Sequence, residues 1–320
     1  MTRPLRIDFP GAWHHVMHWS QAHRPAFPSP AHRSQFLALL REIDHDFSVE
    51  VHAYCLMDDG YQLLLRTPRA NLSRAMRHLN GVYTQIHNRM QGTDGSLFRG
   101  RFKSIVVDGD TYLGPVTRYI HRWPADTRRL LCPERYDYSS YPAYLGSVTT
   151  PEWLHVEETL ALFGERHRHE RYRGFVEAGV DEELKRFYAN RRVSPVLGAR
   201  SFCKRIGMGR EARSAETSPA GPNGSAAAAI DSIIAATAQY FDVDARSLCH
   251  GRRGKRNLPR AVAMALCHQS ASYSLEEVAQ AFGVTSLAAI SLAIYRLKAR
   301  QRDDPSLCRD VETLRRRLFP

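Results

Sequence analysis

Two periodicities of apolar residues alternate along the first half of the chain. Short, largely apolar runs predict strands at 13–17, 49–57, 61–67 and 103–108. Apolar residues three and four positions apart predict helices at 32–47 and 71–90, and a third helix that begins at Asp110 and ends before Pro124. Asn71 is a candidate N-cap for the second helix. The order strand–helix–strand–strand–helix–strand predicts an α+β sandwich of the ferredoxin-like type.

The pattern changes near residue 207. The segment from Gly209 to Ala229 reads GREARSAETSPAGPNGSAAAA, a composition typical of a flexible linker. Residues 230–320 follow a helical pattern without a convincing strand, which predicts an all-α domain. We therefore expect a ferredoxin-like domain at 1–165, a helical extension at 166–207, a linker at 208–229 and an all-α domain at 230–320.

Charge and cysteine usage narrow the function classes. Lys and Arg outnumber Asp and Glu by 45 to 33, a formal net charge of +12, which favours polyanionic partners such as nucleic acid. The six cysteines are scattered without a Cys-x-x-Cys pair, which argues against a thiolate zinc site and against a disulfide scaffold. No apolar run is long enough to span a bilayer and no signal-peptide core is present, so we expect a cytoplasmic protein without membrane contacts.

Basic residues gather in the second half of the first domain. Between Arg69 and Lys103 there are seven Lys or Arg residues and one acid. Three of the arginines lie off the apolar stripe of the 71–90 helix and should face outward: Arg74, Arg77 and Arg89. In the segment GSLFRGRFKS, Phe98 and Phe102 alternate with the cations Arg99, Arg101 and Lys103. Cations interleaved with rings suit single-stranded nucleic acid, and the alternative is a solvated basic face over core phenylalanines.

Four ordered blocks of the first half resemble a known family. They read HAYCLMDDGYQLLLRTP, NLSRAMRHLNGVYTQIHNR, LFRGRFKSIVVD and RYIHRWP. From about residue 3 to residue 163 the chain resembles the REP-associated tyrosine transposases, relatives of the single-strand transposases of small insertion sequences. The resemblance implies a ferredoxin-like fold, usually dimeric, that recognises hairpin DNA and cleaves one strand through a helical tyrosine. It also implies a divalent ion, magnesium or manganese, held by a His-hydrophobic-His pair and a polar residue one turn after the tyrosine.

The ligand positions of that family are altered in this chain. Tyr119 stands at the position of the nucleophile, but Gly60 and Gln62 replace the histidine pair and Trp123 replaces the polar ligand. Glycine and tryptophan offer no metal-binding side chain and a neutral amide is a weak ligand, so we expect no metal cofactor. Gly114 and Pro115 should also loosen the tyrosine helix. Tyr119 then has a second interpretation, as an ordinary half-buried helix tyrosine.

Three histidines near the first strand do not restore the ligand set in this interpretation. They are His14, His15 and His18. Unpaired structural histidines are the commoner case, and we expect that role for all three.

The segment from Ile230 to Val284 reads IDSIIAATAQYFDVDARSLCHGRRGKRNLPRAVAMALCHQSASYSLEEVAQAFGV. Through this segment, residues 230–320 resemble the DNA-binding domain of the replication initiator DnaA, a helical domain with a helix-turn-helix. Phosphate contacts are expected from a wholly basic stretch: Arg252, Arg253, Lys255, Arg256 and Arg260. Ser274 should cap one helix and Gly283 should form the turn. The expected base contacts come from Thr285, Ser286 and Ser291. The Asp-His-Thr-Thr stretch of DnaA proteins is missing, so the domain should not read the DnaA site.

Together these features predict a bacterial, nucleoid-associated DNA-binding protein of transposase descent. Its expected partners are hairpin DNA, duplex DNA and, by family resemblance, a second copy of the chain. Nicking should be lost or impaired. One alternative is an active transposase that nicks and rejoins single-stranded DNA through Tyr119 with magnesium or manganese. Another is an RNA-hairpin-binding module, which the helix-turn-helix disfavours because such a motif normally reads duplex DNA.

Overall fold

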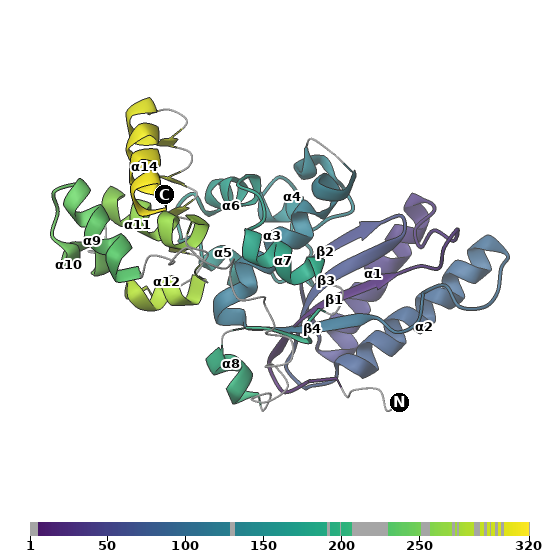
Figure 1. The fold of residues 1–320 in the computed structure, drawn as a ribbon. Helices are drawn as coiled ribbons and strands as arrows, with labels where there is room; N and C mark the ends of the chain where they lie inside the picture. The colour runs from purple at the N-terminus through teal and green to yellow at the C-terminus, as the bar shows by residue number, and fades with distance from the viewer. Residues whose placement is uncertain are drawn as a thin grey trace. The chain divides into compact units, whose positions relative to one another are not determined.

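The computed structural model of the chain separates into two compact units, Met1–Met208 and Gly209–Pro320, which are considered in turn (Figure 1). The structure describes residues 6–128, 132–190, 193–198, 200–206, 230–250, 257–270, 273, 275–284, 289–290, 293–294, 296–297, 300–301 and 304–319. The linker expected at 208–229 lies outside these residues. Within the described part, no helix has the length and apolar character to cross a membrane.

A single sheet organises the first unit, in the order β2-β3-β1-β4-β5. Its strands are β1 (Ala12–Trp19), β2 (Glu50–Met57), β3 (Gly60–Thr67), β4 (Lys103–Val107) and β5 (Val196–Leu197). The first four strands pair antiparallel, and β5 joins β4 in parallel. The predicted α+β fold with a ferredoxin-like strand order is therefore confirmed. The fifth strand, which comes from the C-terminal extension, was not predicted.

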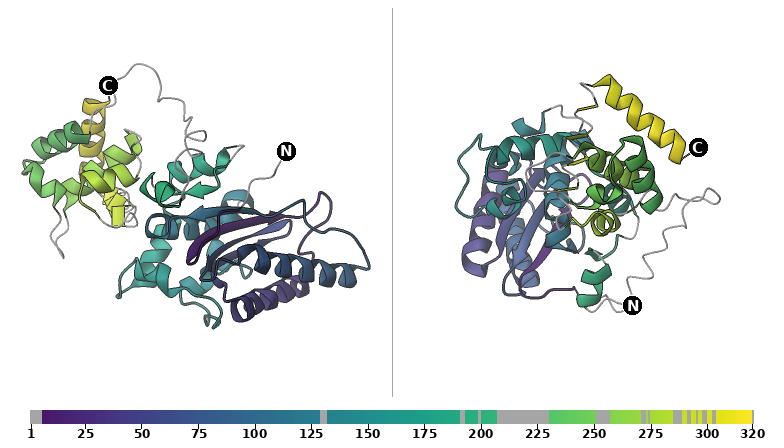
Figure 2. Two further views of the ribbon diagram at one scale, coloured as in Figure 1. Left: turned by 90° about the horizontal axis from the view of Figure 1, so that it is seen from below. Right: turned by 90° about the vertical axis from the view of Figure 1, so that its left-hand side faces the viewer.

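Two long helices, α1 (Pro30–Phe47) and α2 (Leu72–Gln91), pack side by side on one face of the sheet (Figures 1 and 2). Asn71 does occupy the N-cap position of α2, but its side chain makes no cap bond. Its amide instead donates to the carbonyl of Phe47, 2.7 Å away. The carboxylate of Asp8 accepts the backbone N–H of Leu72 at 2.9 Å, so a residue before β1 caps this helix.

The opposite face of the sheet is covered by α3 (Gly109–Arg128), the helix that carries Tyr119. The prediction that this helix ends before Pro124 is wrong, because both Pro115 and Pro124 lie inside it. Close packing supports the helix at these points: a Cβ on Gly114 would lie 3.6 Å from Leu162. The hydroxyl of Thr127 donates at 2.6 Å to the carbonyl of Trp123, one turn earlier in the same helix.

The rest of the first unit consists mainly of short helices. They are η1 (Pro133–Arg135), α4 (Tyr141–Tyr144), α5 (Glu157–Ala161), α6 (Arg168–Glu177), α7 (Glu182–Ala189) and α8 (Arg200–Arg205). The segment after α3 runs along the outer edge of β2, where Leu56 donates its N–H to Tyr138 at 2.9 Å. Since β5 covers β4 on the other side, both edges of the four-stranded sheet carry backbone partners.

In the second unit every described element is helical. These elements are α9 (Ile230–Tyr240), α10 (Ala245–Cys249), α11 (Leu258–Ala265), a π-helical turn (Leu266–Ser270), α12 (Leu275–Ala281) and α14 (Pro305–Leu318). They share a core that includes Ile233, Leu248, Val262, Phe282 and Leu314. Gly283 follows α12 with a φ of +60°, so the predicted turn is present and uses the left-handed backbone that glycine tolerates. The predicted cap Ser274 lies outside the described residues.

Candidate active site and nucleic-acid surface

The two positions that the family resemblance assigns to a histidine pair, Gly60 and Gln62, lie on β3, on the face of the sheet that α3 covers. Side chains two residues apart on a strand point to the same face, so Gly60 and Gln62 share this side. Opposite them on β1 stand Trp19 and Met17, which pair with Gly60 and Gln62 respectively. Tyr119 packs in the same cluster of side chains. The structure thus brings the degenerate ligand positions and the candidate nucleophile to one side of the sheet.

The position of Gly60 is sterically closed to any other residue. A Cβ built on Gly60 would lie 2.4 Å from the carbonyl oxygen of His18 and 3.1 Å from the Cα of Trp19. Both atoms belong to the backbone of β1. Because β1 pairs with β3 on one side and with β4 on the other, a shift of this strand would disturb backbone hydrogen bonds. A histidine therefore does not fit at this position without a shift of the strand.

Gln62 is engaged in a buried hydrogen-bond chain. Its side-chain oxygen lies 3.0 Å from Nε2 of His15, and Nδ1 of His15 lies 2.5 Å from the hydroxyl of Tyr188 on α7. Burial lowers the pKa of His15 to about 3, although the bond to Gln62 opposes this shift. The imidazole is therefore neutral. Since the amide oxygen only accepts, Nε2 must carry the proton and Nδ1 must accept from Tyr188.

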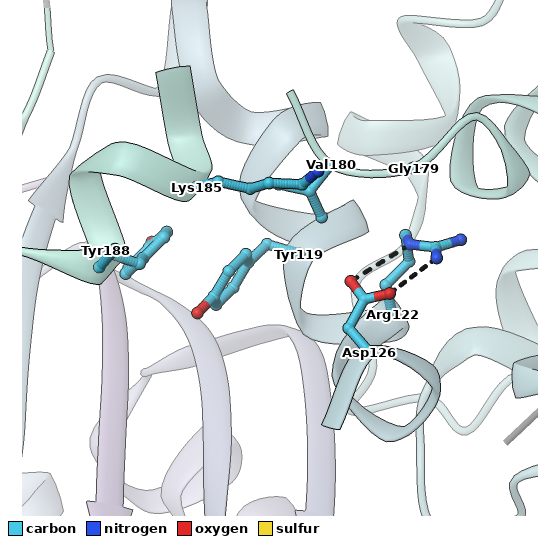
Figure 3. Close-up of a pocket in the computed structure, with 8 residues that line it drawn as sticks. Tyr119, Arg122, Asp126, Gly179, Val180, Lys185 and Tyr188 are labelled. Atoms are coloured by element: carbon cyan, nitrogen blue, oxygen red, sulfur yellow. Dashed lines mark hydrogen bonds and ion pairs between the residues drawn. The ribbon is translucent and has the colours of Figure 1, made fainter. Parts of the chain in front are cut away.

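Tyr119 is half-buried beside this chain (Figure 3). Its ring stacks on that of Tyr188, with 4.1 Å between centroids and 19° between planes. The edge of the His15 ring lies near it, with 5.9 Å between centroids. Desolvation by burial raises the pKa of Tyr119, and the negative charge of Asp126 raises it further. Both effects oppose the phenolate that a nucleophilic tyrosine must reach.

The side chains around Tyr119 do not fit a divalent ion. Gly60 has no side chain, and the oxygen of Gln62 already accepts from His15. Trp123 lies half-buried in the same cluster, and its indole has no lone pair for a metal. Among the residues that the structure describes, no group of three His, Cys, Asp or Glu side chains is placed to hold an ion. No step of a reaction can therefore be assigned to a metal at this site.

A pocket of about 480 Å³ opens on the outer side of Tyr119, between α3 and α7. Figure 3 shows its lining, which is Tyr119, Arg122, Asp126, Gly179, Val180, Lys185, Tyr188 and Ala189. The carboxylate of Asp126 accepts from Nη2 of Arg122 at 2.7 Å and from Nε at 3.3 Å. The hydroxyl of Tyr119 points away from this ion pair.

Buried polar contacts fix α3 on the rest of the unit. His121 is fully buried, with Nε2 2.7 Å from the hydroxyl of Ser140 and Nδ1 2.6 Å from that of Tyr172. Arg118, which is 2% exposed, forms an ion pair with Asp181 at the start of α7. These contacts set the rotation of α3 and therefore the direction of Tyr119.

Two residues of this site, Tyr188 and His121, escaped the sequence analysis, and the partners of His15 were not predicted. Tyr188 carries no local signal, because its partner on β1 is 173 positions away. The expectation of unpaired structural histidines holds for none of the three on β1. His14 pairs with Asp8, with 3.1 Å between Nε2 and Oδ1, and His18 stacks on Phe98 with 4.4 Å between centroids.

The predicted basic surface of the first unit is exposed. Exposed side chains are found at Arg74, Arg77, Arg89, Arg99, Arg101 and Lys103. The interleaved rings are not available for base stacking, which corrects the first interpretation of this segment. Phe98 is 4% exposed, and Phe102 is half-buried beneath the guanidinium of Arg6, 3.5 Å from the ring centroid. The pattern is that of a basic face over core phenylalanines.

Of the contact residues predicted in the second unit, the structure describes Arg260 alone. It is half-buried, and its Nη2 donates to the carbonyl of Phe282 at 2.7 Å, which ties α11 to the end of α12. Part of its guanidinium therefore has a structural role. The other predicted contacts lie outside the described residues: Arg252, Arg253, Lys255, Arg256, Thr285, Ser286 and Ser291.

Comparisons with known proteins agree with this division. Residues 10–123 match the family model of IS200-like transposases, and residues 230–296 match the model of the bacterial DnaA helix-turn-helix. The DnaA proteins of Caulobacter sp. strain K31 and Caulobacter vibrioides strain NA1000 are each 33% identical over 90 residues, which are 28% of this chain and 18% of theirs. The chain thus spans less than a fifth of the length of these relatives.

Among solved structures, a REP-associated tyrosine transposase bound to a REP hairpin is 12% identical, with a TM-score of 0.41 over 47% of this chain and 89% of that one. The two family matches confirm both resemblances that the sequence suggested. Residues 10–123 of the chain are therefore similar to the IS200-like transposase family, and residues 230–296 are similar to the helix-turn-helix of bacterial DnaA proteins.

Proposed function

We propose that this protein binds structured DNA through its transposase-like domain and does not cleave it efficiently with a metal ion. One observation carries the proposal: the oxygen of Gln62, at a former ligand position, is committed to the buried His15, and the neighbouring position has room for glycine alone. Gly60 and Gln62 therefore both leave this face of β3 without a side-chain atom available to bind a metal ion. The family's ion therefore has no site in this arrangement of side chains.

The chemistry of strand cleavage supports loss of activity. A tyrosine with an ordinary pKa near 10 needs help to become a nucleophile, and a divalent ion normally supplies charge stabilisation at the phosphate. Burial and Asp126 raise the pKa of Tyr119 above its ordinary value. The neighbouring His15, with a pKa of about 3, is a poor base.

DNA is the proposed partner because both domains belong to DNA-acting families and the chain has a formal net charge of +12. In the first unit, the exposed cations Arg99, Arg101 and Lys103 are proposed to contact phosphates, together with Arg74 and Arg77 on α2. A hairpin is the proposed form of the DNA, as the family resemblance implies. Contacts to phosphates do not require stacking on nucleobases. The burial of Phe98, which removes it as a stacking surface, therefore does not affect this proposal.

The second domain is proposed to grip duplex DNA beside the hairpin, with the segment 208–229 as the linker between the domains. Such binding would place the protein at the bacterial nucleoid. A homodimer remains a proposal as well. It would have to use surfaces other than the sheet edges, because β2 and β4 already have backbone partners.

The alternative is an active nickase, and one observation favours it. Tyr119 is only half-buried and lines an open pocket, so its surroundings do not exclude DNA. Without a fitting metal site, this activity would require a different means of stabilising charge on the phosphate.

A binding titration with the full-length protein tests the proposal. The probe is a DNA hairpin with single-stranded flanks, measured by fluorescence anisotropy with manganese or with EDTA. We expect similar affinity under both conditions, and weaker binding when Arg99, Arg101 and Lys103 are changed together to Gln. A matched control changes three exposed arginines elsewhere in the first unit, Arg41, Arg135 and Arg186, to Gln. Equal losses in the two triple variants, or affinity that requires manganese, would contradict the proposal.

A further inference from the structure

The pocket beside Tyr119 has one flat aromatic wall. Tyr188 lies behind Tyr119 with 4.1 Å between ring centroids, and the hydroxyl of Tyr188 is anchored on His15. In Figure 3 the ring of Tyr119 stands between Tyr188 on one side and the Arg122–Asp126 pair on the other. One face of Tyr119 is therefore covered by a ring, and both tyrosines line the pocket. A planar group entering the pocket would extend the stack.

The pocket is also lined by an ion pair, Arg122 and Asp126, whose side chains hold each other in a fixed orientation. The carboxylate of Asp126 is held by two nitrogens of Arg122, whose third nitrogen, Nη1, donates to the carbonyl of Val176 at 3.0 Å. A carboxylate held in this way retains free lone pairs and accepts further hydrogen bonds. Among nucleobases, this favours those with an exocyclic amino group, which offers two donor hydrogens, over thymine, whose single donor is the ring N3–H.

An exposed cation lies on the α7 side of the pocket. Nζ of Lys185 is 2.8 Å from Glu182, and the side chains of the pair are 54% and 68% exposed. Exposed pairs of this kind are held only weakly in water. A phosphate near the pocket can therefore recruit Lys185 by a stronger, charge-assisted contact.

The pocket size sets the class of ligand. A volume of about 480 Å³ is within the range of roughly 300–1,000 Å³ typical of sites for small molecules. A base can enter a cleft between two helices only when it is unpaired.

We propose that this pocket binds one unpaired nucleotide of single-stranded DNA, with its base on Tyr119, its amino group on Asp126 and its phosphate on Lys185. The proposal rests on the proposed function, since it assigns a place to the unpaired strand beside the hairpin. It needs no reaction at Tyr119, which acts here as a stacking surface.

The test uses full-length protein and fluorescently labelled single-stranded pentanucleotides of deoxycytidine or thymidine. We expect tighter binding of the deoxycytidine probe. Tyr119→Leu should weaken it about fivefold or more, because stacking of one base contributes roughly that factor at its lower limit. Tyr119→Phe keeps the ring and removes the hydroxyl, so it should bind like the natural protein. Lys185→Gln should weaken binding, whereas Arg186→Gln, a matched loss of charge on the same helix outside the pocket, should not.

Two results would overturn the pocket assignment. One is equal affinity of Tyr119→Leu and Tyr119→Phe for the deoxycytidine probe, and the other is an absence of binding by the natural protein. A blunt hairpin without single-stranded flanks, titrated in parallel, separates this failure from failure of the proposed function. If the blunt hairpin binds and the pentanucleotide does not, only the pocket assignment fails.

Discussion

The side-chain oxygen of Gln62 and Nε2 of His15 lie 3.0 Å apart, and both residues are buried. This bond joins β3 to β1 on the face of the sheet that α3 covers. The same imidazole accepts from Tyr188 through its other nitrogen, so neither nitrogen of His15 is left for a metal. Gln62, which the family resemblance assigns to a ligand position, is therefore part of the packing between the sheet and α7.

The bond predicts that manganese does not bind at this site. Isothermal titration of the full-length protein with manganese should show no stoichiometric binding that depends on Gln62. The Gln62→Ala variant serves as the control, since it removes the only side-chain oxygen at the two β3 positions. A one-to-one site in the natural protein that disappears in Gln62→Ala would contradict the structure.

The close approach of β1 to β3 predicts a large cost for any side chain at residue 60. Gly60→Ala should lower the free energy of unfolding by roughly 1–3 kcal/mol, because the new Cβ would overlap backbone. Gly81→Ala is the matched control, since Gly81 is exposed on α2 with nothing near its Cβ. It should raise stability by up to about 1 kcal/mol. Urea unfolding of both variants checks this, and equal stabilities would refute the clash.

The clash also bears on restoring the family's ligand set. The triple variant Gly60→His, Gln62→His and Trp123→Asn should lose stability and remain inactive, because the first change displaces β1. Adding Pro115→Leu should not rescue it, since α3 is already helical at that position. Manganese-dependent nicking by a well-folded triple variant would show that the strand moves more easily than its packing implies.

Two buried histidines predict a loss of stability in acid. The pKa values of His15 and His121 are both lowered to about 3 by burial, from an ordinary value of 6.5. The unfolded chain therefore takes up protons below about pH 6.5 that the folded chain refuses until about pH 3. Stability should be complete above this window and fall within it by up to about 1.4 kcal/mol per pH unit for each histidine.

Urea unfolding between pH 7 and pH 4 measures this slope. His15→Gln should reduce it by about one proton. NMR titration of the His15 ring gives an independent readout if the variant does not fold. An imidazole that protonates near pH 6.5 would contradict its burial.

The helix-turn-helix domain predicts a change in salt dependence. Deleting residues 230–320 should weaken duplex DNA binding and reduce the slope of log K against log salt by about 0.9 for each phosphate that the protein no longer neutralises. The first unit has its own core, so it should stay folded, which circular dichroism checks. An unchanged slope would mean that the basic C-terminal surface does not bind DNA.

Sequence patterns predicted the strands β1 to β4 and the helices between them, because the apolar runs that mark these elements are local signals. The absence of ligands at Gly60 and Trp123 was also readable from the sequence, since it depends on residue type alone. The buried hydrogen-bond chain of Gln62, His15 and Tyr188 could not be predicted from the sequence. These residues meet only when β1, β3 and α7 pack together. Phe98 shows the converse error: alternation with cations suggested exposure, but β4 and its preceding loop turn that ring into the core.

The end of α3 was mispredicted for a related reason. A proline removes one backbone donor, which ends an isolated helix more readily than one packed against a sheet. In this chain α3 packs against β2, and the helix continues through Pro124 to Arg128. Local propensity did not include this tertiary support.

The most direct measurement of the central claim is a search for a covalent protein–DNA adduct at Tyr119. Full-length protein and its Tyr119→Phe variant are incubated with a hairpin carrying single-stranded flanks, with and without manganese, and analysed by denaturing gel and mass spectrometry. The structure predicts binding by both proteins, with no manganese-dependent adduct and no cut strand. A phosphotyrosine adduct in the natural protein that Tyr119→Phe lacks would contradict the account and establish the nickase in its place.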